Sequence, residues 1–412
     1  MTLLKTVLVL SLVAVCGANL TLGRIQGAVM IALWLALVVG TIEGLPVRRP
    51  AAVTRVSLLI VGYGAFLVMA TFVNGDGSRQ VYMTLLAGPA CALYLVLRGI
   101  RPPRHFVAVL MTAVAVGQAA VAWIQYLRPA LFRSVTSPVA GAFAAASDFY
   151  LDMGRATGLW PTAVTLGTVL AGCLPFAIYL ALTWRRAAWV CVAFIIGTIG
   201  LTGSRAPMGA ALLILVAMLW TSTRHWSRRA VLLVLIAGVA LLASTIPPFD
   251  AIVGRGLGVG SLTAEYTPSE TIVNRGIVYT ILTPHVFDSP ILGIGSRFQS
   301  LLPSGWTSAH NSYLQSTLVF GIPATLLLAL VLAALLQVTV ACRRSRDIAF
   351  LCACVLTVFA VAFVGISHGV LMDFSTNMFV WLGVGLGFLE YNWLLRTREA
   401  LNRPGFLGGS RA

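Results

Sequence analysis

The chain has 412 residues, of which 59% are hydrophobic and only 10% are charged. Soluble domains carry about 25% charged residues, so this composition excludes an ordinary soluble enzyme and indicates a protein that crosses a membrane several times. The net charge of +16 does not indicate a nucleic-acid partner, because the basic residues form short clusters between apolar runs, a pattern typical of membrane topology.

Apolar runs long enough for a helix to cross about 30 Å of hydrocarbon recur along the whole chain. The sequence therefore predicts an all-α polytopic membrane protein, with residues 1–412 forming a single integral membrane domain. The twelve predicted spans are residues 3–20, 25–42, 53–72, 81–97, 106–124, 161–182, 187–201, 206–220, 230–246, 314–340, 348–365 and 377–395.

Arginine clusters lie in every second connection between the predicted spans, for example around Arg48 and Arg343. Because cytoplasmic loops retain Lys and Arg, we expect both termini to lie in the cytoplasm. We also expect membrane lipids to surround the spans. The first span could instead be a cleaved signal peptide, which would not change the rest of the topology. Residues 125–160 and 247–313 are then long outer loops, and such loops often carry function.

The turn between the seventh and eighth predicted spans holds a candidate anion site at Ser204 and Arg205. Both flanking spans are short, so we expect the turn to dip below the outer membrane surface and Arg205 to be half-buried. Ser204 as a cap and Pro207 in the first turn predict a helix start, where N–H groups attract anions. Arg205 could bind a phosphate there, or it could only anchor the helix at lipid headgroups.

His310 lies just before the tenth predicted span, with Asn311 or Ser312 as the expected helix cap. Because a helix N-terminus and nearby arginines disfavour imidazolium, we expect His310 to be neutral near pH 7 and able to accept a proton. A lone histidine in a loop is more often polar surface, so its position alone does not decide for catalysis.

Three motifs in the second half of the chain form a recognisable combination. They are Thr202-Gly203-Ser204-Arg205, Ser289-Pro290-Ile291-Leu292-Gly293-Ile294-Gly295, and His310-Asn311-Ser312-Tyr313-Leu314-Gln315 with Phe320-Gly321 close behind. With these motifs the chain resembles the superfamily of O-antigen ligases and Wzy-type polymerases. The resemblance covers about residues 187–320.

This resemblance implies a glycosyltransferase with the GT-C type of membrane fold, in a bacterial inner membrane and with a periplasmic active site. Its donor would be a glycan on undecaprenyl diphosphate, and its acceptor lipid A-core for a ligase or another lipid-linked glycan for a polymerase. Carried over by position, His310 would activate the acceptor hydroxyl, and Arg205 and Arg275 would hold the donor diphosphate. Candidates for supporting roles are Asn311, Arg297 and Ser204.

The implied reaction needs neither a metal ion nor another cofactor, because diphosphate is already a good leaving group and arginines can bind its charge. The sequence also lacks an Asp-x-Asp pair that could hold a metal with a nucleotide sugar. We expect a ligase rather than a polymerase, because the large outer loop is compact and the chain carries one clear arginine pair together with the histidine.

Two other functions stay open from the residues alone. A polysaccharide or lipid transporter could bind diphosphate lipids in the same basic cavity without needing His310, although the spans hold few ionisable groups. A peptidoglycan polymerase would need an essential outer acid, for which Asp288 is the candidate. The sequence does not decide whether His368 and Asp373 support His310 or only pack.

Overall fold

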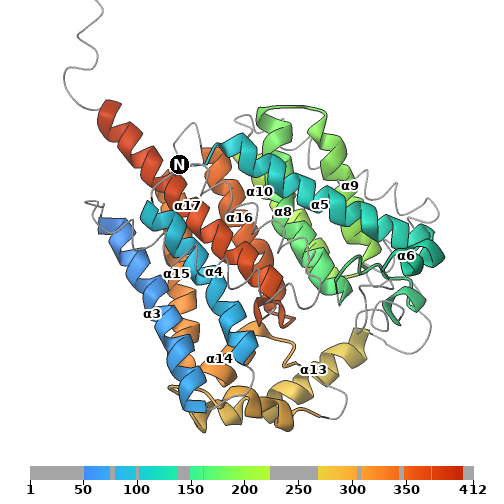
Figure 1. Cartoon of the computed structure of the whole chain (residues 1–412), viewed down its shortest axis with the longest axis vertical. Helices are drawn as coiled ribbons and strands as arrows, with labels where there is room; N and C mark the ends of the chain where they lie inside the picture. Colours follow the sequence, from blue (N-terminus) through green and yellow to red (C-terminus); the bar gives the residue numbers. More distant parts are fainter. Residues whose placement is uncertain are drawn as a thin grey trace, which may run out of the picture.

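The computed structural model describes residues 51–74, 79–98, 102–136, 149–160, 162–222, 268–303, 308–342, 348–372 and 374–401. Regular structure in these ranges is helical throughout (Figure 1). In this described part of the chain, six helices are long and apolar enough to cross a membrane, and shorter apolar helices accompany them. The protein is therefore an all-helical, polytopic membrane protein, as predicted.

The long helices agree with the predicted spans to within a few residues, with one exception described below. They are α3 (Ala51–Asn74), α4 (Arg79–Arg98), α5 (Arg104–Leu127), α8 (Ala163–Thr183), α9 (Ala188–Leu201), α10 (Arg205–Ser222), α15 (Ile322–Cys342), α16 (Ile348–Gly365) and α17 (Phe374–Leu401). The predicted spans at 3–20, 25–42 and 230–246 lie outside the described residues, so the total of twelve stays a prediction.

Helix α8 forms the centre of the core, and its side chains are buried along nearly the whole helix. Its small residues let neighbouring helices approach closely, and Thr357 of α16 donates a hydrogen bond to the carbonyl of Gly172 (2.8 Å). At one end of the bundle, Arg104 of α5 pairs with the buried Glu390 of α17. The arginine-rich connections predict this end to be cytoplasmic.

Short helices lie at the opposite end of the bundle, most of them within the two segments that the sequence predicted as long outer loops. They are α6 (Pro129–Thr136), α13 (Pro268–Leu282), α14 (Ser312–Phe320) and the 3₁₀ helices η1 (Pro284–Phe287) and η2 (Gly295–Leu301), with η3 (Val370–Met372) in the last connection. Figure 1 shows α13 lying across the lower end of the long helices. These segments position the candidate site.

The prediction of one span over residues 314–340 was wrong, because the chain forms two helices that are separated at Gly321. Gly321 has φ 87°, so it ends α14, and α15 begins at the next residue. The loop around Pro290 packs into this break, and the N–H of Ile322 donates to the carbonyl of Pro290 (2.8 Å). Two of the three sequence motifs therefore contact each other here.

We expect Gly321→Ala to destabilise the protein by about 2–5 kcal/mol. A Cβ atom at residue 321 would lie 2.1 Å from the carbonyl oxygen of Ile291, and the positive φ is strained for alanine. The matched control is Gly117→Ala in α5, where a Cβ would meet no atom within 4 Å. Thermal denaturation in detergent should show a lowered midpoint for the first variant only, and equal midpoints would contradict this packing.

Candidate active site

His310, the central residue of the candidate site, has a strained backbone conformation. It has φ 49°, and among the described residues it is the only one other than glycine with a positive φ. Its N–H donates to the hydroxyl of Ser308 (3.3 Å), and its carbonyl accepts from the hydroxyl of Tyr279 on α13 (3.1 Å). Strain of this kind is concentrated at functional sites and needs such support from the surrounding structure.

Asn311 is the cap of α14, as the sequence predicted. Its side-chain oxygen accepts hydrogen bonds from the N–H groups of Tyr313 (2.9 Å) and Leu314 (3.0 Å). Ser312, the alternative cap, instead donates to the carbonyl of His368 (2.7 Å) and accepts from the N–H of Leu371 (3.0 Å). The start of α14 therefore fixes both His310 and the loop that carries His368.

Arg275 and His368 lie beside His310, although they come from distant parts of the chain. Nη2 of Arg275, on α13, lies 3.4 Å from Nε2 of His368, which follows the end of α16. The rings of His310 and His368 have centroids 6.2 Å apart and are oriented edge to face. The structure thus brings His310 and Arg275 together and adds His368 to the pair.

Burial and positive charge keep both histidines neutral. Burial, followed by the charge of Arg275, lowers the pKa of His310 to about 4. Burial also lowers the pKa of His368 to about 3, with further contributions from Arg275, His310 and Arg155. This direction agrees with the neutral state expected for His310, and its largest cause is burial, which the sequence analysis did not consider.

Arg155 is part of the site and was missed by the sequence analysis. It donates from Nε to the carbonyl of Thr202 (2.8 Å) and from Nη2 to the hydroxyl of Ser204 (2.8 Å). The adjacent backbone is fixed by Gln125 of α5, whose side-chain oxygen accepts from the N–H of Thr157 (2.8 Å). The charge of Arg155 also contributes to the lowered pKa of His368, so the 202–205 turn lies within electrostatic range of that histidine.

Arg205 is the first residue of α10, as the predicted helix start requires, and its side chain is exposed on the surface of the protein. Its half-burial at the membrane surface stays a prediction, and Arg155 binds polar groups of the turn itself. The hydroxyl of Ser204 accepts a hydrogen bond from Arg155 and donates one to the carbonyl of Thr202. Arg155 therefore holds in place the turn that carries Arg205.

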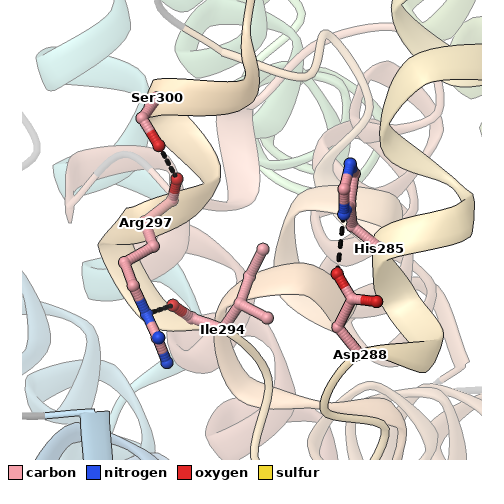
Figure 2. Close-up of polar contacts among 5 residues, drawn as sticks. All are labelled: His285, Asp288, Ile294, Arg297 and Ser300. Carbon is pink, nitrogen blue, oxygen red and sulfur yellow. Dashed lines mark hydrogen bonds and ion pairs between the residues drawn. The ribbon is translucent and has the colours of Figure 1, made fainter.

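Arg297 and Asp288 lie on the outer loop, and both are exposed. Figure 2 shows Arg297 on η2, where its Nε donates to the carbonyl of Ile294 (3.3 Å). The same view shows Asp288 facing His285, with 2.6 Å between Oδ2 and Nδ1. These contacts favour a solvated surface role for Arg297 and Asp288. Asp373 lies outside the described residues.

These features define a polytopic membrane protein with a polar site of arginines and histidines at one end of its helices. Residues 189–329 match the family model described as O-antigen ligase, so this segment of the chain is similar to that family. The resemblance found in the three motifs is thereby confirmed. A search of curated proteins found no match to the chain.

The matched segment contains only part of the site. It includes Arg205, Arg275 and His310, whereas Arg155 and His368 lie outside it. Within the described residues, no three His, Cys, Asp or Glu side chains form a group that could hold a metal ion. The chemical groups gathered in the described part of the site are therefore arginine N–H donors and neutral imidazoles.

Proposed function

We propose that the protein is a GT-C type glycosyltransferase that moves a glycan from undecaprenyl diphosphate to an acceptor hydroxyl at the periplasmic face of a bacterial inner membrane. The match to the O-antigen ligase family supports a lipid-linked glycan as substrate. The observation that carries the proposal is the neutral, half-buried imidazole of His310 beside the guanidinium of Arg275. A proton acceptor next to a fixed cation is what this transfer requires.

His310 acts as the general base in this proposal. The acceptor hydroxyl gives its proton to the imidazole while its oxygen forms a bond to the anomeric carbon of the donor sugar. The bond between that carbon and the diphosphate oxygen breaks on the opposite side, so the configuration at carbon is inverted. A histidine with a lowered pKa is available for this step because it carries no proton near pH 7.

Arg275 and Arg205 bind the diphosphate, which takes the electron pair of the broken bond. A guanidinium donates two parallel hydrogen bonds to phosphate oxygens, and it stays protonated even when burial lowers its pKa, as it does for Arg275. This arrangement needs no metal ion to neutralise the leaving group. Metal independence is thus a further part of the proposal.

We expect Arg205→Lys to lower transfer at least about tenfold if Arg205 clamps the diphosphate, because an ammonium group cannot reproduce the planar two-point contact. An arginine that only anchors the helix at lipid headgroups could be replaced by lysine without loss. Steady-state rates at low donor concentration distinguish these roles. Rates equal to those of the unmodified protein would assign Arg205 to the anchor.

The pH dependence should report His310. Below its pKa the imidazole is protonated and cannot accept the hydroxyl proton, so activity is lost on the acid side. We expect the acid limb of kcat/KM, which reports the free enzyme, to have its midpoint far below the ~6.5 of an ordinary histidine, near the pKa of about 4. The acid limb of kcat should lie higher, because the bound diphosphate offsets the charge of Arg275.

A limb of kcat/KM near 6.5 would contradict this account of the base. The donor does not obscure this measurement. Its diphosphate is esterified at both ends and does not ionise between the pKa of about 4 and the ~6.5 of an ordinary histidine.

We favour an O-antigen ligase, with lipid A-core as the acceptor, and the alternative within the same chemistry is a Wzy-type polymerase. The lipopolysaccharide gel pattern of a strain without the protein distinguishes them. Unmodified core with accumulated lipid-linked polymer would support the ligase, whereas core that carries a single repeat would support the polymerase. A full-length pattern identical to that of the parent strain would contradict both.

A further inference from the structure

His368 has a hydrogen-bond arrangement that fixes its protonation. A guanidinium only donates hydrogen bonds, so Nε2 of His368 must be the acceptor for Nη2 of Arg275 (3.4 Å). The ring proton of the neutral imidazole then lies on Nδ1, which donates to the hydroxyl of Ser367 (2.9 Å). Ser367 donates in turn to the carbonyl of Val364 (3.3 Å), near the end of α16.

The backbone of His368 is fixed as firmly as its ring. Its carbonyl accepts from the hydroxyl of Ser312, in the first turn of α14, and Ser312 also accepts from the N–H of Leu371. His368 therefore links α16 and α14 to Arg275 on α13. Figure 1 shows α13 across the lower end of the long helices, so this contact reaches from the ends of α14 and α16 to an arginine on a separate helix.

We propose that His368 is a positioning residue, which holds the guanidinium of Arg275 in the plane required to bind the donor diphosphate. The inference rests on the proposed function, since it assigns Arg275 to that diphosphate. By accepting one N–H, the imidazole restricts rotation of the guanidinium, and the remaining N–H groups are directed to the ligand. Residues that hydrogen-bond to metal ligands fix the orientation of those ligands in the same way.

A positioning role differs from two other roles that a buried histidine could have. A second general base would act on the reacting hydroxyl, so its loss would lower kcat. If His368 only packed, the effect of a replacement on stability would depend on the size of the new side chain. It would not depend on which ring nitrogen the new side chain imitates. A residue that orients Arg275 acts on donor binding, and only its acceptor at Nε2 matters.

Two amide variants separate these roles. His368→Gln places an amide oxygen near the position of Nε2, so it can still accept from Arg275. His368→Asn places its amide near Nδ1, so it can contact Ser367 but cannot reach Arg275. The two replacements have the same chemistry and differ mainly in reach, which makes each a control for the other.

The measurement is binding of undecaprenyl diphosphate to the purified full-length protein in lipid nanodiscs, together with kcat and KM for transfer. We expect His368→Gln to keep the Kd within about threefold of the unmodified protein and His368→Asn to raise it about tenfold or more. In both variants kcat should change by less than about threefold. In an Arg275→Ala background, His368→Asn should have almost no further effect on the Kd, because the two residues act as one unit.

Equal Kd values for the two amide variants, or an equal loss of kcat in both, would overturn the positioning role while leaving the proposed function intact. If the unmodified protein does not bind undecaprenyl diphosphate, the proposed function fails and this inference fails with it. Should His368→Asn not yield folded protein, His368→Leu tests the same loss of the acceptor at Nε2 with a side chain of similar size. It should raise the Kd about threefold or more, and an unchanged Kd would contradict the inference.

Discussion

His310→Ala is expected to lower turnover by about 10²–10⁴-fold while leaving the affinity for the donor nearly unchanged. The arginines contact a charge that is already present in the bound donor, so they set binding. A base acts only as the acceptor O–H bond breaks, so its loss appears in kcat. Initial rates and the Kd for undecaprenyl diphosphate, measured on the same purified samples, check both parts.

Two further variants make this result interpretable. His310→Asn should give the same loss, and asparagine tolerates the positive φ at this position better than alanine does. His285→Ala is the matched control, because His285 lies on the same outer loop and contacts Asp288 at the surface. Robust turnover by both His310 variants, or a loss of binding equal to the loss of rate, would show that His310 is not the base.

Arg275→Lys is expected to lower kcat/KM for the donor by about 10²-fold or more. Lysine keeps the charge of arginine but donates from a single point, so it loses both the two-point contact with phosphate and the directed contact with His368. Partial burial also disfavours the charged amine, as it already lowers the pKa of Arg275. Kinetics at varied donor concentration and direct binding should show the loss mainly in binding.

Arg297→Lys is the control for Arg275→Lys, because Arg297 lies on the same outer loop with its side chain exposed. We expect its kinetics to match those of the unmodified protein. Nearly normal activity of Arg275→Lys, with normal donor affinity, would place the diphosphate elsewhere.

The membrane-spanning part of the fold was predictable because it depends on hydropathy alone. Helices α5 and α16 coincide with predicted spans to within a few residues, since a long apolar run can only satisfy its backbone in a membrane as a helix. The break at Gly321 was not predicted, because hydropathy does not change there. It depends on a loop 30 residues earlier, near Ile291, packing against the glycine.

Part of the candidate site was predictable for a different reason. His310 lies in a local motif that can be recognised on its own, and Asn311 has the residue type and position of a helix cap. Arg275 was assigned by its position in the family resemblance. Arg155 and His368 have no such local signal, because their partners lie far away in the sequence. His368 is 93 residues from Arg275, so only the packing of α13, α14 and α16 brings them together.

The most direct test of the account is transfer by the purified protein in nanodiscs, with a synthetic undecaprenyl-diphosphate glycan, an acceptor glycan and EDTA. We predict one elongated acceptor for each undecaprenyl diphosphate released, at a rate that EDTA does not change and that His310→Asn reduces to background. Movement of intact donor across the bilayer, with no acceptor elongated, would contradict the account and identify a transporter.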